Sequence, residues 1–280
     1  MQTTYRQRTP SPTNTSRLKV KKLEYAVHED PNLGLRQGME DFTIVEPDLH
    51  GDGAFAFFCV LDGHGGQNVA KYIKDNYPKI LKSRLETYKM AYSLPSILKM
   101  TIDNIENQIK MIGGRDMGST FCGVLIDRQN ARYFTINIGD SRALYARVVS
   151  MIKPELKFLT TEHKVSNPEE AERIKKTGGT VFNGRLAGNL LVSRSLGDFD
   201  FKKYGLSSSP DILEYDVGIH DVLIIASDGI WDTVGIEDIE KSIKENALAN
   251  LDKFAKSTAE LAVNKGSNDN ISIIVIKMAN

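Results

Sequence analysis

Between residues 55 and 66 the chain reads Phe55-Ala56-Phe57-Phe58-Cys59-Val60-Leu61-Asp62-Gly63-His64-Gly65-Gly66, an apolar run that stops at an aspartate and a glycine-rich turn. An unbroken run of aromatic and branched residues, bounded by a turn signal, is typical of a strand that is buried on both faces. The same arrangement recurs at residues 222–229, where an apolar run ends on Asp228-Gly229. The two stretches predict a strand-rich core with carboxylates at the strand ends.

Other segments complete this pattern of secondary structure. Segments rich in β-branched and aromatic residues predict strands over 20–27, 42–46, 55–61, 119–126, 132–138, 142–149, 222–227 and 271–277. The short turn Gly139-Asp140-Ser141 predicts that 132–138 and 142–149 form a hairpin. Apolar residues at helical spacing predict helices around 69–77, 94–112, 236–243 and 251–261. A further helix is expected from Asn167-Pro168-Glu169-Glu170, an N-cap followed by proline, up to Gly178-Gly179.

The order of these elements indicates the fold class. Helices occur in pairs between groups of strands, which favours antiparallel sheets with helices on their outer faces over a doubly wound parallel sheet. No internal repeat and no linker divides residues 18–280, so we predict one domain there. Residues 1–17 are rich in Ser, Thr, Pro and Arg, and we expect a flexible polar tail. Thr9-Pro10 and Ser11-Pro12 leave open that this tail is a phosphorylation target.

Composition excludes several classes of protein. The 280 residues include 36 Lys and Arg and 36 Asp and Glu, and this balance argues against a protein that binds nucleic acid by neutralising phosphates. Five His and two Cys argue against a disulfide scaffold and a multi-cysteine zinc domain. The longest apolar run, residues 54–61, is shorter than the roughly 18 residues that would span a bilayer. With its polar N-terminus, the sequence predicts a soluble intracellular protein with no membrane partner.

The aspartates lie at the ends of predicted strands. Strand ends in a compact sandwich converge on one rim, where carboxylates repel one another unless a cation is present. All the available ligands are oxygens, which selects Mg²⁺ or Mn²⁺ over Zn²⁺ or Cu²⁺. Two such ions about 4 Å apart would suit an in-line displacement at phosphorus. The carboxylates that support this hypothesis are Glu40, Asp41, Asp62, Asp140, Asp198, Asp228 and Asp269.

Other chemistries fit the sequence poorly. It contains no Walker phosphate loop, no His-Glu-x-x-His and no Gly-x-Ser-x-Gly. Cys122 and Arg128 have the spacing found in cysteine-dependent phosphatases, but the residues between them form an apolar strand. A strand cannot wrap its N–H groups around a phosphate, so this match is rejected.

The sequence resembles the metal-dependent serine/threonine protein phosphatases of type 2C (the PPM family) from about residue 23 to residue 277. The departures, Ser195 where many members carry Ala and the unusual segment 28–32, touch no metal position. The motifs that carry the resemblance are Arg36-Gln37-Gly38-Met39-Glu40-Asp41, Asp62-Gly63-His64-Gly65-Gly66, Gly118-Ser119-Thr120, Asn137-Ile138-Gly139-Asp140-Ser141-Arg142, Glu162-His163-Lys164, Val192-Ser193-Arg194-Ser195-Leu196-Gly197-Asp198, Ala226-Ser227-Asp228-Gly229-Ile230-Trp231-Asp232 and Asp269-Asn270-Ile271-Ser272.

The resemblance implies an α+β fold, with a central antiparallel β-sandwich flanked by pairs of helices in four layers, α-β-β-α. It also implies phosphoserine/phosphothreonine hydrolysis by metal-activated water, without a phosphoenzyme. In the catalytic roles it implies, Arg36 binds the substrate phosphate and His64 protonates the leaving oxygen. By the same resemblance two Mg²⁺ or Mn²⁺ ions are bridged by Asp62, one held also by Gly63 and Glu40 and the other by Asp228 and Asp269, with Asp41 beside them and Asp140 and Asp232 at a further, weaker ion.

Two other functions stay open at this point. One is a phosphatase-like binding module without catalysis, although such a module would be expected to lose carboxylates that are all present here. The other is a metal-dependent hydrolase of small phosphate esters. We expect phosphorylated protein substrates, a monomer, and a cytoplasmic or nuclear location. His163, Arg194 and Trp231 are expected to support the fold, and residues 163–190 to form a flap beside the site.

Overall fold

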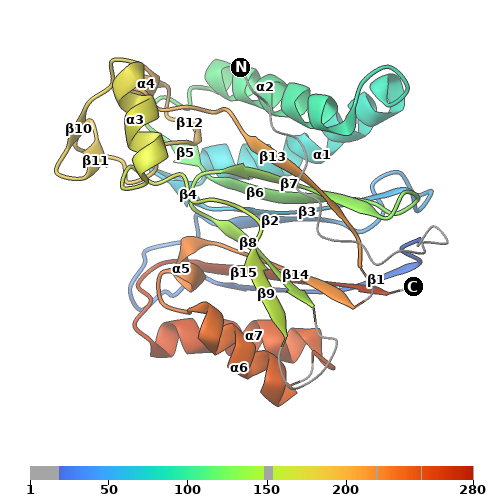
Figure 1. Ribbon diagram of the computed structural model, residues 1–280. Coiled ribbons are helices and arrows are strands. Elements are labelled where there is room, and N and C mark those ends of the chain that lie inside the picture. Colours follow the sequence, from blue (N-terminus) through green and yellow to red (C-terminus); the bar gives the residue numbers. More distant parts are fainter. Residues whose placement is uncertain (1–18, 148–153, 219, 247, 280) are drawn as a thin grey trace.

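The computed structural model describes residues 19–147, 154–218, 220–246 and 248–279 (Figure 1). The predicted tail, residues 1–17, lies outside the described residues, as does the end of the strand predicted over 142–149. Among the helices of the described ranges, none is both long enough and apolar enough to cross a membrane.

The core is built from two five-stranded sheets in which neighbouring strands run antiparallel. The first sheet has the order β1-β15-β14-β8-β9, formed by Lys22–Asp30, Ile271–Ala279, Asp221–Ala226, Arg142–Arg147 and Glu155–Phe158. The second has the order β13-β7-β6-β3-β2, formed by Asp211–Asp216, Arg132–Ile138, Phe121–Asp127, Phe55–Leu61 and Phe42–Glu46. Smaller sheets join β12 (Leu196–Gly197), β5 (Gly118–Ser119) and β4 (Gly63–His64), and β10 (Val181–Phe182) with β11 (Arg185–Leu186).

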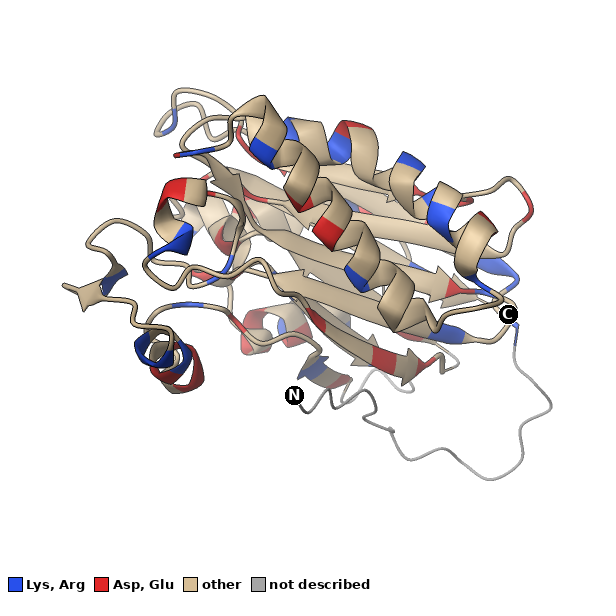
Figure 2. Cartoon of the chain, turned by 90° about the horizontal axis from the view of Figure 1, so that it is seen from above, with Lys and Arg blue, Asp and Glu red and all other residues tan. Residues whose placement is uncertain are grey.

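Helices cover the outer faces of the two large sheets (Figure 1). Helices α1 (Asn68–Tyr88) and α2 (Leu94–Ile112) pack on the sheet of β3, and α6 (Ile236–Asn246) and α7 (Leu251–Asn264) pack on the sheet of β15. Shorter helices are α3 (Pro168–Lys176), α4 (Phe199–Lys202) and α5 (Asp228–Trp231). The predicted mixture of helices and antiparallel sheets is confirmed. Figure 2 shows acidic and basic residues interspersed along the helical layer nearest the viewer.

Strand β3 explains why the chain needs an uninterrupted apolar run at 55–61. Alternate side chains point to opposite faces of a strand, and both faces of β3 are covered. Phe57, Cys59 and Leu61 pack into the core under α1 and α2. Phe58 and Val60 pack into the core between the two sheets. A strand with one solvated face would show polar residues at every second position.

The hairpin predicted from Gly139-Asp140-Ser141 is wrong. Strand β7 pairs with β6 and β13 in one sheet, whereas β8 pairs with β14 and β9 in the other. The turn therefore passes from one sheet to the other, and Gly139 has a φ of 100° there, in a region that glycine adopts without strain. A short turn between two strands indicates that they are near each other, but it does not show that they pair.

Among the described strands of four or more residues, two edge strands were also missed, and one boundary was misplaced. Strands β9 and β13 lie at sheet edges and mix charged with apolar residues, so their composition is less typical of strands. The strand predicted over 119–126 is divided, because Gly118–Ser119 pairs with β4 and β12 while the main strand begins at Phe121. Thr120 therefore lies between β5, in the small sheet, and β6, in the large sheet, beside the site described below.

We predict that Phe57→Ala lowers the free energy of unfolding by about 3–5 kcal/mol, because it leaves a cavity in a packed aromatic cluster. The Phe57 ring lies 5.1 Å from that of Tyr77 and 6.2 Å from that of Phe121, measured between ring centroids. Urea unfolding followed by circular dichroism measures the change. Met90→Ala is the control, since Met90 is 92% exposed. Equal effects of the two substitutions would contradict this account of the core.

Candidate active site

Three carboxylates from both sheets meet at one rim of the sandwich. Asp62 follows β3, Asp228 begins α5 directly after β14, and Asp140 lies in the turn between β7 and β8. One oxygen from each lies within 4.8 Å of the oxygens of the other two. The convergence predicted from the strand ends is therefore present for these residues.

Thr120 fixes the relative position of two of these strand ends. Its Oγ1 accepts a hydrogen bond from the Asp62 N–H (3.1 Å), and its own N–H donates to the Asp62 carbonyl (2.9 Å). The Thr120 and Ser141 hydroxyls are hydrogen-bonded at 2.7 Å, and Ser141 directly follows Asp140. Thr120 thus connects the ends that carry Asp62 and Asp140.

The clustered carboxylates have strongly perturbed acidities. Burial, followed by repulsion from neighbouring aspartates, raises the pKa of Asp62 well above its usual range. The same two causes raise the pKa of Asp140 to about 7 and that of Asp228 to about 6. Burial also raises the pKa of Asp41 to about 7, although the neighbouring hydroxyls of Ser227 and Ser272 oppose the shift. Each shift reports a carboxylate without enough compensating positive charge.

The donor set fits a hard divalent cation. Asp228 Oδ1 and Asp41 Oδ2 are buried without a hydrogen-bond partner, which is costly unless an ion takes that place. All the groups in the cluster are oxygen ligands, the type preferred by Mg²⁺ and Mn²⁺. A cation would supply the missing counter-charge and lower all four pKa values together.

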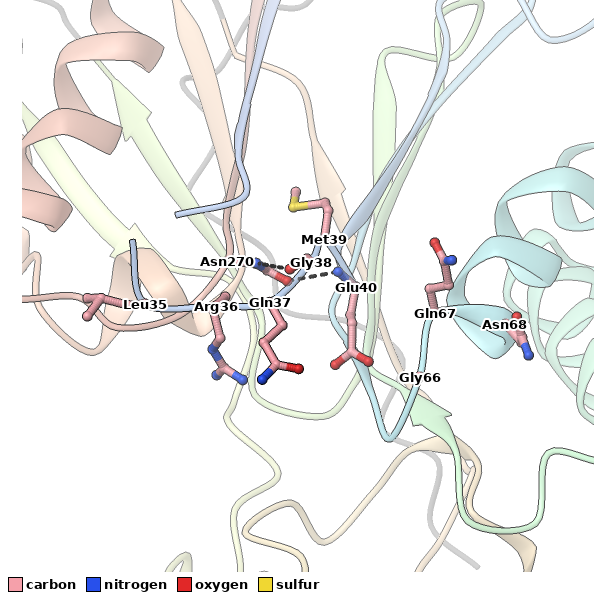
Figure 3. Close-up of a pocket in the computed structure, with 10 residues that line it drawn as sticks. All are labelled: Leu35, Arg36, Gln37, Gly38, Met39, Glu40, Gly66, Gln67, Asn68 and Asn270. Atoms are coloured by element: carbon pink, nitrogen blue, oxygen red, sulfur yellow. Dashed lines mark hydrogen bonds between the residues drawn. The ribbon is translucent and has the colours of Figure 1, made fainter. Parts of the chain in front are cut away.

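A loop of residues 31–41 forms the other side of the rim. Asn270 holds it, because its Oδ1 accepts the Glu40 N–H (2.8 Å) and its Nδ2 donates to the Gly38 carbonyl (2.9 Å). Figure 3 shows Arg36, Gln37 and Glu40 pointing to the same side of this loop. That side opens into a cavity of about 690 Å³, lined by Leu35, Arg36, Gln37, Gly38, Met39, Glu40, Gly66, Gln67, Asn68 and Asn270.

Gly63 permits the close approach of this loop to β4. A Cβ at Gly63 would overlap the carbonyl oxygen of Glu40. A side chain here would therefore push the Glu40 backbone away from Asp62, the neighbour of Gly63 in the chain. The Glu40 backbone therefore lies against Gly63, although the Glu40 carboxylate is not one of the three that meet at the rim.

Arg36 and Asp269 form an ion pair at the edge of the cluster. The Arg36 guanidinium also donates through Nε to the carbonyl of Asn268 (3.0 Å). The predicted phosphate-binding residue thus contacts a predicted metal ligand, and 42% of its side chain remains exposed on the cavity side. Arg36 therefore lies beside one predicted ligand and also lines the cavity.

His64 has a partner that sequence reasoning did not assign. Its Nε2 lies 2.6 Å from Oδ2 of Asp198, and Ser195 Oγ donates to the same oxygen at 2.6 Å. Gly118 makes room for the pair, because a Cβ there would overlap Asp198 and lie 2.6 Å from His64 Nε2. Burial lowers the pKa of His64, but the hydrogen bond and charge of Asp198 outweigh it, so the pKa is raised. The Gly197-Asp198 turn was the available signal.

The remaining predicted residues lie around this centre. Asp232 contacts the ammonium of Lys164, and that ammonium also lies 3.8 Å from Asp140. His163 lies 3.1 Å from Asp211, and Arg194 pairs with Asp211 as well as with Glu170 on α3. These pairs connect the predicted flap to the sandwich. Trp231 packs in the core and donates to the Ala226 carbonyl (3.0 Å).

The family model described as Protein phosphatase 2C matches residues 25–271. The chain belongs to the protein phosphatase 2C family. Its resemblance to human Protein phosphatase 1A is 33% identity over 286 residues, covering 88% of this chain and 72% of the relative. Human Protein phosphatase 1B is also 33% identical, with 88% of this chain and 56% of the relative covered. The chain is thus a member of a family of protein serine/threonine phosphatases, as its motifs predict.

Solved structures share the fold of this phosphatase 2C chain. A serine-threonine phosphatase 2C from Toxoplasma gondii matches with a TM-score of 0.76 and 24% identity, covering 96% of this chain and 99% of that one. A structure described as a C. elegans sex determining protein matches with a TM-score of 0.79 and 23% identity, covering 92% of this chain and 65% of that one. At these identities the likeness concerns the fold alone.

We predict that the metal-free phosphatase loses stability as the pH rises from 5 to 7. The folded pKa values of Asp41, Asp140 and Asp228 lie above the ordinary value of 3.8, so the folded state binds protons more tightly than the unfolded state in this range. The melting temperature in chelator should therefore fall with pH, and less steeply in Asp62→Asn. Scanning calorimetry measures both slopes, with Asp103→Asn on α2 as the control.

Added Mn²⁺ should reverse this loss, because a cation that binds only the folded state stabilises it. At a hundredfold excess over Kd the gain is about 2.7 kcal/mol, or roughly 5–10 °C in melting temperature. Two results would contradict the interpretation of the carboxylate cluster. One is a melting temperature that rises from pH 5 to 7 in chelator. The other is a melting temperature that does not change when Mn²⁺ is added to the metal-free protein without chelator.

Proposed function

We propose that this chain is an active phosphoserine/phosphothreonine protein phosphatase that uses two divalent cations, Mg²⁺ or Mn²⁺. The observation that carries the proposal is the group of Asp62, Asp140 and Asp228, whose oxygens lie within 4.8 Å of one another, with Asp140 buried and the other two half-buried. Buried carboxylates this close destabilise a protein unless a cation joins them. The family membership supports the reaction class.

The residues that would hold the ions come from both sheets. Asp62 would bridge the two ions. The Gly63 carbonyl and Glu40 would complete one site, and Asp228 and Asp269 the other, with Asp41 alongside. Asp140 and Asp232 would belong to a further, weaker ion. When bound, the ions supply positive charge to the phosphoryl oxygens and lower the pKa of water, so that a hydroxide nucleophile is available at neutral pH.

Arg36 would bind and orient the substrate phosphate. A guanidinium offers two parallel donors to a pair of phosphoryl oxygens, and it keeps its charge at any physiological pH. The ion pair with Asp269 holds the Arg36 side chain at the mouth of the cavity. A phosphate bound there would also be in reach of the carboxylate-held cations.

His64 would donate a proton to the departing serine or threonine oxygen. An alkoxide is a poor leaving group, so protonation lowers the barrier, and a histidine with a raised pKa keeps its proton near neutral pH. Asp198 would act as a positioning residue, because its buried carboxylate fixes the imidazole and favours the imidazolium.

Two other functions make different predictions for substrate choice and turnover. A binding module would bind phosphoproteins without turnover, but every carboxylate of the proposed ligand set is present in this chain. A hydrolase of small esters would turn over a sugar phosphate as well as a phosphothreonine peptide. Parallel assays of the two substrates with Mn²⁺ test the proposal. Turnover of the peptide alone supports it, and preference for the sugar phosphate would overturn it.

We predict that Asp62→Asn and Asp228→Asn each reduce kcat on a phosphothreonine peptide by at least about 10³-fold, because Asp62 would contact both ions and Asp228 one of them. Asp103→Asn, an exposed carboxylate paired with Lys99, should leave kcat unchanged. Circular dichroism shows whether each variant is folded. A folded Asp62→Asn variant with near wild-type kcat would remove the assignment.

We predict that His64→Gln affects a phosphothreonine peptide far more than an aryl phosphate, whose leaving group needs little protonation. The loss on the peptide should be roughly 10²–10⁴-fold. Asp198→Asn should show the same selectivity with a smaller loss of roughly 10–100-fold, because the imidazole remains but is less well oriented. The ratio of kcat on the two substrates is the measurement. Equal losses on both substrates would assign the two residues a structural role.

A further inference from the structure

The ammonium of Lys164 lies among three carboxylates at the outer side of the cluster. Its Nζ is 2.9 Å from Asp232 Oδ1, 3.4 Å from Glu162 Oε1 and 3.8 Å from Asp140 Oδ2. The Lys164 side chain is 24% exposed and that of Asp140 only 5%. The ammonium therefore places a positive charge next to the negatively charged carboxylates of the rim.

The backbone at Lys164 holds the ammonium there. The His163 N–H donates to the Gly139 carbonyl (2.9 Å), next to Asp140 in the chain, and Val165 N–H donates to the Leu191 carbonyl (2.9 Å). Lys164 itself forms an antiparallel bridge with Val192. These contacts join the start of the flap, residues 163–190, to the turn that carries Asp140. These backbone contacts fix the position from which the lysine side chain extends to the rim.

The charges around Lys164 are those that a divalent ion would need. Asp140 is close to Asp62 and Asp228, and Asp232 contacts the same ammonium at 2.9 Å. An ammonium and a divalent cation that share two carboxylates would lie within a few ångströms of each other, where their repulsion is strong. One of the two must therefore move away before the other binds.

We propose that Lys164 is a built-in cation that competes with a third divalent ion for Asp140 and Asp232. The wild-type protein would bind two ions tightly and admit a third only by displacing the ammonium. The inference rests on the proposed ligand set at Asp62 and Asp228, and adds to it an assignment for Lys164. It also gives the flap a direct electrostatic connection to the metal centre, through a residue that is not a ligand.

Mn²⁺ binding to the full-length protein tests the proposal without an activity assay. The protein is stripped with chelator, dialysed and titrated with Mn²⁺, and free Mn²⁺ is followed by electron paramagnetic resonance alongside titration calorimetry. Lys164→Met and Lys164→Gln should each tighten the third, weakest binding event by at least about tenfold, because a nearby positive charge is removed. Lys164→Arg keeps the charge and should retain the wild-type isotherm.

Two further variants identify the site that is gained. Asp232→Asn combined with Lys164→Met should abolish the tightened event. Lys99→Met removes an exposed lysine that pairs only with Asp103 among the contacts of the described residues, and it should change nothing. Melting temperatures with and without Mn²⁺ show whether each variant is folded, and two substitutions at Lys164 guard against the failure of one.

The outcomes separate this inference from the proposed function. Two tight ions in wild type and a tightened third in both Lys164 variants support it. Two tight ions in wild type with an unchanged third event in the folded variants would overturn it and leave the proposed function standing. A wild-type protein that binds no Mn²⁺ would overturn the proposed function, and this inference with it.

Discussion

Like charges repel most strongly where water cannot screen them, and this chain places several carboxylates in such a position. The rim formed by the half-buried Asp62 and Asp228 and the buried Asp140 is a local source of instability that the rest of the fold must hold in place. Thr120 and Asn270 hold the backbone segments that carry the rim, and Gly63 lets two of those segments touch. Two positively charged side chains also lie next to it, Arg36 at Asp269 and Lys164 at Asp140.

This arrangement explains how the protein can accept a cation without a large rearrangement. The oxygens already face one another, so binding exchanges repulsion for attraction and requires little movement of the backbone. The two positively charged side chains have different relations to that step. Arg36 contacts a proposed ligand from the cavity, where a phosphate would enter. Lys164 contacts the cluster from the start of the flap, through Asp140 and Asp232, and is not among the residues that line that cavity.

Much of the fold and most of the proposed site were predictable, because both depend on local sequence patterns. The apolar run before Asp62 requires two covered faces, and aspartates at strand ends require a common rim. The assignment of β7 and β8 to different sheets was not predictable from their short turn, since a turn limits the distance between two strands but not which sheet each strand joins. The contact between Asp198 and His64 was also missed. Asp198 stands out locally as a carboxylate after a glycine, but its hydrogen bond to a residue 134 positions away leaves no local signal. The resemblance to a family supplied the roles of Arg36 and His64, which spacing alone does not reveal.

The turn that carries Asp140 has a wider consequence. It passes from one sheet to the other. Asp62 and Asp228 follow strands of different sheets, so the distance between their oxygens depends on the distance between the two sheets. Side chains such as Phe58 and Ile225, packed between the sheets, set that spacing from a distance. Cation affinity in this fold is therefore a property of the inter-sheet core as much as of the ligands. Evolution could tune it by exchanging one buried aliphatic residue for another, without altering any group that touches the ion.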